Sequence, residues 1–451
     1  MKTQLINLLL SIRYSYWFVP TLMAVIAIAL SFVMITLDGV IEDKWIRSFG
    51  WLYATGPEGT RAVLAAVAGS MIGVAGVVFS ITIVTLTLAS SQFGPRLLRN
   101  FMRDKGNQIV LGTFIATFIY CLLILRTVQG TEEQSFVPSL SAAFGVLLAM
   151  LSLGVLIYFI HHVSASIQAD NVIAAVSQDI DEAIKRLFPE KLGHGTPQPQ
   201  EPGKAPDIPP GFAYQARPVP AVSRGYLQAI DGDGLLHIAT EKDLVLRLEY
   251  CPGHFVVPGS ALVCVWPGAC LDEQLTREIN RLFVLGPQRT HEQDPEFAFS
   301  QLVEIAVRAL SPGINDPFTA ATCVEWLSAG LCQLAERDLP SPYRYDEHHA
   351  LRVIAPQLTF ADIANLVFTR IRQYSRSSIM VTLTLLETIA VIAAYVQRDE
   401  DRLALLQQAA MIERGSQEGL PEAQDRQQVE ACYRAALRAL EAQTPGHQAS
   451  A

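Results

Sequence analysis

Four long apolar segments, none of which contains a charged residue, constrain this chain more than any other feature. They cover residues 17–37, 62–89, 109–125 and 138–160. A helix of about 20 apolar residues crosses the hydrocarbon core of a bilayer, so we expect four transmembrane helices. The first segment could instead be a signal peptide, but no small-residue cleavage site follows it, which favours a retained helix.

The composition agrees with a membrane protein. Charged residues make up 17% of the 451 positions, whereas soluble domains carry about 25%. The net charge of −9 argues against a broad nucleic-acid-binding surface. The seven cysteines are odd in number and scattered, which is typical of reduced thiols in a reducing compartment. We therefore expect the lipid bilayer, and no nucleic acid, as a partner.

The cations predict the orientation of the four helices. The N-terminal segment and the second loop carry Lys2, Arg13, Arg96, Arg99, Arg103 and Lys105; the first and third loops carry Lys44, Arg47, Arg61 and Arg126. Cytoplasmic loops carry the excess of lysine and arginine. Both termini, and the chain that follows the fourth helix, are therefore expected in the cytoplasm.

The second apolar segment has an unusual composition. Its first half contains Gly69 and Gly73, a small-xxx-small pair that lets helices approach closely. Its second half is rich in hydroxyls, and the residues proposed to line a hydrated pathway are Ser80, Thr82, Thr85, Thr87 and Ser90. The alternative is a packed helix whose hydroxyls bond to its own carbonyl groups. Because no segment has an ionisable residue in its interior, a passive pore is favoured over a charge-coupled pump.

The remaining chain is expected to be a cytoplasmic α+β region. Helical spacing of apolar residues predicts that the fourth membrane helix continues as an extension over 161–188, and the prolines of 189–220 predict a linker. Short alternating runs separated by Gly/Pro turns over 221–270 predict a small β-barrel or sandwich. Residues 271–451 are expected to form a helical domain, a bundle.

A further apolar run at 377–396 could be a fifth membrane helix. Glu387 lies at its centre, where a single acid is expensive in lipid. The polar flanks fit a buried helix of the soluble bundle, and this is the interpretation we favour.

The sequence predicts no cofactor and no metal. Cys251, His254, Cys264 and Cys270 match no standard zinc spacing. The glycine-rich DGDG at 231–234 is read as a turn.

A rigid corner between two helices is expected at 311–317. Ser311-Pro312-Gly313 ends the first helix, and Asp316 before Pro317 is typical of an N-cap and first turn. Asn315, Asp316 and Thr319 form either this structural corner or a ligand-binding one. Because no nucleophile–base pair is evident, we do not expect an enzyme.

Three pieces of sequence carry a family resemblance. They are SSQFGPRLLRNFMRDKGNQIVLGTF at 90–114, YFIHHVSASIQ at 158–168 and RALSPGINDPFTA at 308–320. With the order of segments, the chain resembles a bacterial family of predicted four-span inner-membrane proteins of unknown function. The resemblance implies the membrane architecture and a cytoplasmic domain, and it supplies no activity.

Two classes of function remain open. The composition of the second apolar segment favours a homo-oligomeric pore or channel-like protein with a cytoplasmic regulatory domain. The alternative is a membrane-anchored sensor or scaffold that binds a ligand or partner through its cytoplasmic domain; a membrane enzyme has no residue constellation behind it.

Overall fold

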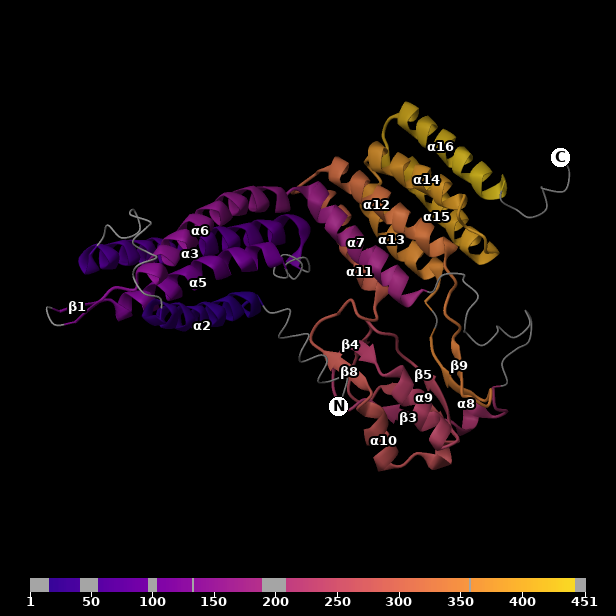
Figure 1. Cartoon of the computed structure of the whole chain (residues 1–451). Coiled ribbons are helices and arrows are strands. Elements are labelled where there is room, and N and C mark those ends of the chain that lie inside the picture. Colours follow the sequence, from indigo (N-terminus) through magenta and orange to yellow (C-terminus); the bar gives the residue numbers. More distant parts are fainter. Residues whose placement is uncertain are drawn as a thin grey trace. The chain divides into compact units, whose positions relative to one another are not determined.

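The computed structural model describes residues 16–40, 56–95, 104–131, 134–188, 208–356 and 358–442 (Figure 1). The chain forms two compact units, Met1–Asn171 and Val172–Ala451, and each is described here by itself.

The first unit contains four long apolar helices. They are α2 (Phe18–Val40), α3 (Pro57–Phe93), α5 (Lys105–Thr127) and α6 (Ser139–Ser166). All four are long and apolar enough to cross a membrane, which confirms the four expected spans. With 37 residues, α3 extends for about 55 Å, more than a bilayer core requires.

Helix α5 is the centre of this unit, because it packs against α2, α3 and α6. Half of the residues in the apolar stretch of α5 are buried, whereas 22% or less are buried in those of α2, α3 and α6. Phe114, Tyr120 and Ile124 of α5 are fully buried. A short hairpin of β1 (Gln129–Thr131) and β2 (Gln134–Phe136) connects α5 to α6.

The expected continuous extension to residue 188 is wrong. Helix α6 ends at Ser166, and a separate helix, α7 (Ala169–Leu187), follows. The Asn171 side chain donates a hydrogen bond of 2.8 Å to the Ala165 carbonyl, which stabilises this break. Helix α7 buries one apolar face, with Ile173, Ile180 and Ile184 fully covered.

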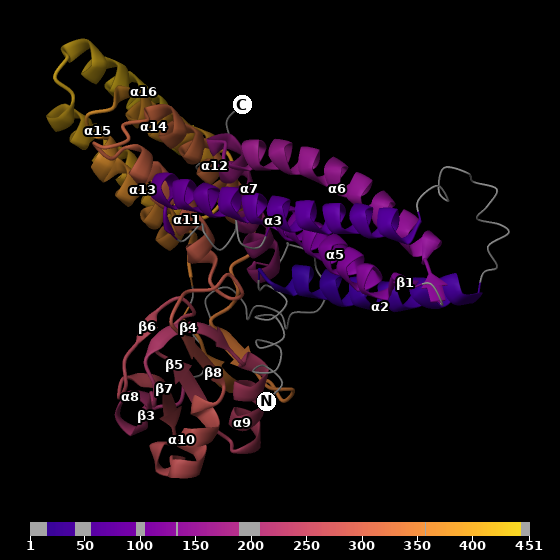
Figure 2. The ribbon, with the colours of Figure 1, turned by 90° about the vertical axis from the view of Figure 1, so that its left-hand side faces the viewer.

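The second unit contains two β-sheets. The strands are β3 (Arg217–Pro220), β4 (Gly225–Ile230), β5 (Val245–Leu248), β6 (Phe255–Val256), β7 (Ala261–Trp266), β8 (Phe283–Gly286), β9 (Tyr343–Tyr345) and β10 (Leu351–Ile354). The larger sheet has the order β3-β7-β5-β10-β9 and the smaller β6-β4-β8. Figure 2 labels β3, β5 and β7 of the larger sheet and β4, β6 and β8 of the smaller one. Only the β10–β5 pair is parallel among these described strands.

One apolar core lies between the two sheets. Leu227 and Phe283 of the smaller sheet share it with Leu246 and Val263 of the larger one. The described strands of this unit form two open sheets and no closed barrel. The expected range of 221–270 for the β part is wrong, because β8, β9 and β10 come from the range 271–451 that was expected to be helical, and β3 precedes residue 221.

Short helices complete the β region. They are α8 (Phe212–Gln215), α9 (Gly232–Glu241), the 3-10 turn η3 (Gly268–Cys270) and α10 (Glu273–Asn280). The DGDG segment begins α9 instead of forming a free turn: Asp231 is the N-cap and accepts a 3.0 Å hydrogen bond from the Gly234 amide.

The proline-rich segment is not a free linker over its whole expected range. Residues 189–207 lie outside the described residues. After them, Phe212 of α8 is buried, and the Trp266 indole donates to Gln215 Oε1 at 3.3 Å. The end of the range therefore belongs to the folded β region.

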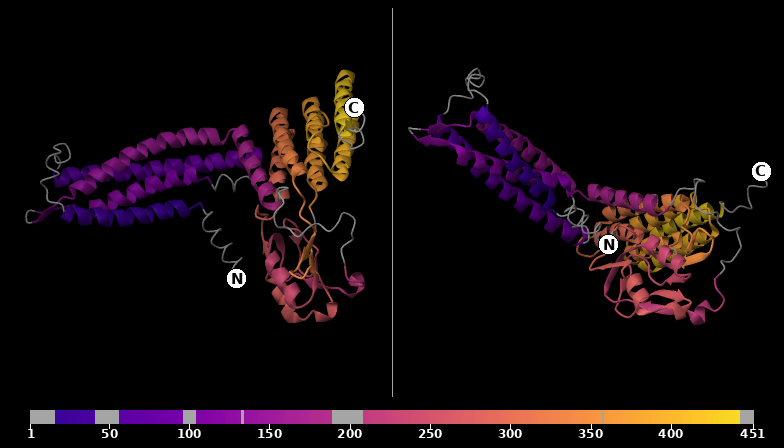
Figure 3. Two further views of the ribbon diagram at one scale, coloured as in Figure 1. Left: turned by 45° about the vertical axis from the view of Figure 1, so that its right-hand side comes forward. Right: turned by 60° about the horizontal axis from the view of Figure 1, so that its bottom comes forward.

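The helical part consists of three helix pairs stacked side by side (Figures 1 and 3). The helices are α11 (Pro295–Ala309), α12 (Pro317–Glu336), α13 (Phe360–Ser375), α14 (Ile379–Ala393), α15 (Asp399–Gly419) and α16 (Ala423–Ala442). Contacts link α12 to α14 to α16 in one layer and α11 to α13 to α15 in the other. These six helices form the expected helical bundle, in two layers.

The apolar run at 377–396 forms helix α14. It has 15 residues, too few to cross about 30 Å of hydrocarbon. Val381, Leu385 and Ile389 are fully buried where α14 packs against α12, α15 and α16, and Glu387 is exposed. The prediction of a buried helix inside the bundle is confirmed.

Candidate functional site

The five hydroxyl residues proposed to line a pathway lie on two different faces of α3. Thr82 and Thr85 are buried in the four-helix unit. Ser80 and Thr87 lie on the exposed face, and Ser90 is half-buried. The five residues therefore do not share one face of α3: Thr82 and Thr85 lie on the buried face, and Ser80 and Thr87 lie on the exposed one.

The hydroxyl groups bond to their own helix. Ser80 Oγ donates to the Gly76 carbonyl at 2.9 Å, Thr82 Oγ1 to that of Val78 at 2.8 Å, and Thr87 Oγ1 to that of Ile83 at 2.9 Å. Such bonds lower the cost of a hydroxyl in lipid. Each oxygen still has a lone pair available to a further donor.

The exposed face of α3 is lined by small residues at alternating spacings of four and three. Seven small residues lie on this face together with the larger Ile83: Ala62, Ala66, Gly69, Gly73, Gly76, Ser80 and Thr87. A Cβ atom added at Gly69, Gly73 or Gly76 would meet no described atom within 4 Å. We call these eight residues the small-residue face; it lies opposite the buried face of Leu64, Ala75, Val78 and Thr82.

Polar contacts between α5 and α6 were not anticipated from the sequence. Thr117 and Ser152 share a buried hydrogen bond of 3.1 Å, and the Tyr120 hydroxyl donates to the Ser141 carbonyl at 3.0 Å. They fix α6 on α5. In the sequence these residues are single polar groups inside apolar runs, and their spacing forms no pattern that would have revealed the contacts.

Charged side chains brace both ends of the membrane unit. Asp38 at the end of α2 accepts hydrogen bonds of 2.9 Å from the Leu140 and Ser141 amides at the start of α6. At the other end, His162 Nε2 lies 2.6 Å from Oδ2 of Asp104, the N-cap of α5. One of the paired histidines at 161–162 thus has a structural partner, which the sequence did not reveal.

The corner at 311–317 forms as expected between α11 and α12. Asp316 is the N-cap of α12 and accepts from the Thr319 amide at 3.1 Å and from the Thr319 hydroxyl at 2.5 Å. Asn315 has a left-handed backbone, with φ of 52°. Two apolar side chains flank these residues in solvent: Phe318 is 70% exposed and Ile314 44%.

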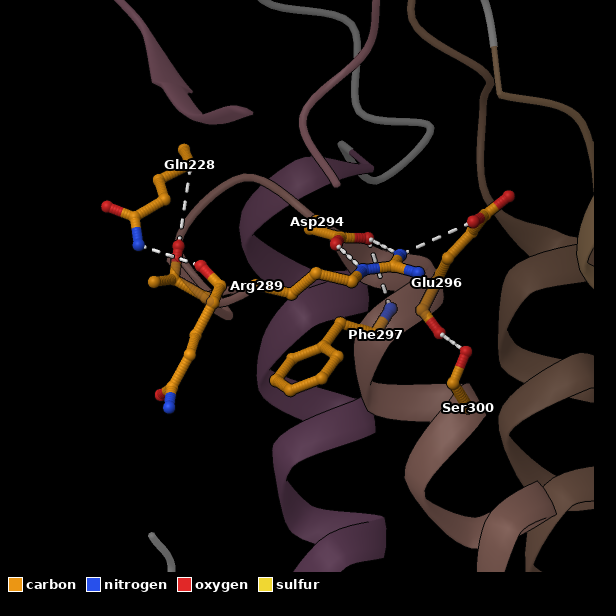
Figure 4. A network of polar contacts seen from close by, with 8 residues as sticks. Gln228, Arg289, Asp294, Glu296, Phe297 and Ser300 are labelled. Atoms are coloured by element: carbon orange, nitrogen blue, oxygen red, sulfur yellow. Dashed lines mark hydrogen bonds and ion pairs between the residues drawn. The ribbon is translucent and has the colours of Figure 1, made fainter. Parts of the chain in front are cut away.

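A desolvated ion pair connects the β region to the helical part (Figure 4). Arg289 donates to both carboxylate oxygens of Asp294, at 2.6 and 2.7 Å, and lies 3.4 Å from Glu296 Oε2. Asp294 also caps α11 through the Phe297 amide at 3.1 Å. Burial raises the pKa of Asp294, and the Arg289 charge opposes this rise only in part.

The turn 251–254 rests on this ion pair. A Cβ at Gly253, whose φ is +96°, would lie 2.3 Å from Asp294 Oδ2, so only glycine fits. On the β side, the Gln293 side chain accepts from the Ile230 amide at 2.9 Å and donates to its carbonyl at 3.1 Å. The start of α11 is thereby fixed to β4.

The candidate metal ligands of the sequence do not converge in the described residues, where no group of three His, Cys, Asp or Glu side chains could hold a metal. In the loop at 346–349, Asp346 accepts hydrogen bonds from the His348 and Ala350 amides and from Arg352 Nε. The Asp346 carboxylate therefore stabilises a turn of the backbone.

Two comparisons with known proteins place the chain. The model of a family described as "Predicted membrane protein (DUF2254)" matches residues 13–391. The chain belongs to this family. Uncharacterised proteins of Mycobacterium bovis and Mycobacterium tuberculosis are 32% identical to it over 437 residues, covering 94% of this chain and 80% of theirs. No solved structure shows a significant match.

Membership in this family agrees with the four membrane-spanning candidates. The orientation of those helices in the membrane stays a prediction.

Proposed function

We propose that this DUF2254 protein is a homo-oligomeric pore of the bacterial inner membrane, with both termini and the second unit in the cytoplasm. One observation carries the proposal: no part of the chain that the structure describes covers the small-residue face of α3.

Close packing between copies of α3 is the physical reason for assembly. Lipid gives no hydrophobic drive for helices to associate, so membrane helices associate where small residues let backbones approach and gain dispersion energy. Three glycines within eight residues, at 69, 73 and 76, supply such a surface. The exposed surface of α6 differs, because large side chains such as Met150 and Ile157 dominate it.

Ser80 and Thr87 then face the axis of the assembly. They extend the same face beyond the glycines, and their hydroxyl oxygens can accept from water. Since the interior of the spans carries no Asp, Glu, Lys or Arg, such a pathway is passive and is lined by hydroxyls and backbone.

Flux through reconstituted vesicles tests this proposal. Wild type should pass small ions, whereas Gly73→Leu should reduce the flux to that of empty vesicles because the side chain separates the α3 helices. Gly154→Leu is the matched control: this glycine of α6 is also exposed, and a Cβ there meets no described atom within 4 Å, but it lies outside the small-residue face.

A second pair of variants separates the lining from the assembly. Ser80→Val with Thr87→Val should lower the flux while the number of copies per particle stays that of wild type. Wild-type vesicles that pass no ion at any pH or voltage would refute the pore.

A sensor or scaffold is the second candidate, and the exposed Ile314 and Phe318 at the corner favour it. Capture of a partner that Phe318→Ser abolishes, in a protein whose vesicles carry no flux, would establish this function instead.

A further inference from the structure

Three arginines gather where α13 and α15 approach the start of α14. Arg372 lies in the last turn of α13, Arg376 follows it by four residues as the C-cap, and Arg414 lies in α15. Side chains four residues apart share one face of a helix, so Arg372 and Arg376 point to the same side.

Contacts between α13 and α15 place Arg414 beside this pair. The Gln408 amide of α15 donates to Asn365 Oδ1 at 2.7 Å and to Thr369 Oγ1 at 3.2 Å. Seven residues further along α15, a Cβ at Gly415 would lie 3.9 Å from Arg376 Nε. The two helices therefore run in the same direction, and Arg414 is level with the arginines of α13.

These arginines are poorly neutralised. Among the described residues, Arg372 and Arg414 have no hydrogen bond or ion pair from their guanidinium groups, and Arg372 Nε is buried without an acceptor. Arg376 has one acid, Glu418, at 3.7 Å, and both side chains are largely in solvent. By contrast, Arg289 and Arg352 each contact two carboxylates.

The electrostatics agree with an excess of positive charge. Burial lowers the pKa of Arg372, and the charges of Arg376 and Arg414 lower it further. The chain as a whole carries a net charge of −9, so three arginines with a single paired acid, Glu418, differ from the rest of its surface.

The first turn of α14 adds backbone donors at the same place. Ser378 occupies its N-cap, but the hydroxyl makes no capping hydrogen bond. The first amides of a helix carry a partial positive charge and bind anions. Ser378 lies two residues after Arg376, so these amides lie next to the arginines.

We propose that Arg372, Arg376 and Arg414, together with the start of α14, bind a phosphate-class anion: a phosphomonoester of a soluble molecule or of a lipid headgroup. The guanidinium fork matches phosphate oxygens in pairs, and Arg372 Nε is a donor that lacks its acceptor. The proposal is independent of the pore.

Binding of inorganic phosphate to the full chain in neutral detergent tests it by calorimetry. Wild type should bind, and Arg414→Gln should weaken the affinity about tenfold or more, because a hydrogen bond to a charged group is lost. Arg414 is exposed, so this variant should keep the melting temperature of the unliganded protein.

Two further variants sharpen the test. Arg370→Gln is the matched control, since Arg370 is exposed on α13 two residues from Arg372 and hence on another side of the helix; its affinity should equal that of wild type. Arg372→Lys keeps the charge but loses the fork and the Nε donor, and should weaken binding as Arg414→Gln does.

Short-chain phosphatidic acid in the same micelles distinguishes the two sources. Much tighter binding than inorganic phosphate assigns the site to a headgroup, and equal binding assigns it to a soluble phosphomonoester; either result supports the proposal. Absence of binding by both probes, or equal affinity in wild type and Arg414→Gln, would overturn it.

Discussion

Single side chains decide where elements begin and which parts of the second unit are held together. Asp231, Asp294 and Asp316 each cap a helix through an amide three residues on. Asp before Pro, at 294–295 and at 316–317, is the sequence pattern that marks two of these caps. The third was hidden because DGDG is also typical of a turn, and only the packing of Leu235 selects the helix.

The cap at Asp316 leads to the first prediction. Asp316→Ala should lower the free energy of unfolding by about 0.5–2 kcal/mol, seen as a lower melting temperature of the purified chain. Asp316→Asn should be nearly neutral, because asparagine caps about as well. A fully stable Asp316→Ala protein would contradict the capping role. A stable but inactive Asp316→Asn protein would show instead that the carboxylate binds a ligand.

Thiol labelling tests the environment of Cys251. Burial, with the nearby charges of Glu296 and Asp294, raises the pKa of this thiol from 9.0 to about 11. At pH 8 its thiolate population is then about 100-fold below that of an ordinary cysteine, so maleimide should react with exposed Cys270 first. Because the folded state favours the protonated thiol, Cys251 contributes to the stability of the fold below pH 9. This contribution is lost as the pH rises through 11, where labelling of Cys251 should accelerate. Equal labelling rates at pH 8 would contradict this environment.

Among the helices and strands, the periodicity and length of apolar runs were sufficient to predict those elements whose defining contacts are local in sequence. The four membrane helices, α14 and the pair α11–α12 follow from apolar runs and caps close in sequence. By contrast, β10 pairs in parallel with β5 across about a hundred residues, and no local pattern encodes such a partner. Strands β9 and β10 were therefore hidden inside a range expected to be helical, and the small-residue face became visible only once the buried side of α3 was known.

Helix α8 offers an element-level prediction. Phe212 is 5% exposed, and the Arg247 guanidinium lies 5.3 Å from its ring centre. Phe212→Ala should therefore destabilise the β region by about 3 kcal/mol, measured by chemical unfolding of the full chain. Tyr214→Ala is the control, because Tyr214 is 94% exposed and should change little. Equal stability of both variants would mean that α8 is not docked.

At the scale of the whole molecule, the membrane topology can be tested with Cys270. This cysteine is exposed in the second unit, which the positive-inside rule assigns to the cytoplasm. A membrane-impermeant maleimide should label it in inverted vesicles and not in intact spheroplasts, with Cys270→Ser as the control for specificity. Labelling in intact spheroplasts would reverse the orientation.

The number of copies per particle shows whether the protein assembles through α3. Light scattering of the purified protein, corrected for detergent, should give several copies for wild type and for Gly154→Leu, but a single copy for Gly73→Leu, because leucine on the small-residue face keeps the α3 helices of neighbouring copies apart. A single copy for wild type, or an unchanged number of copies for Gly73→Leu, would refute assembly through the small-residue face.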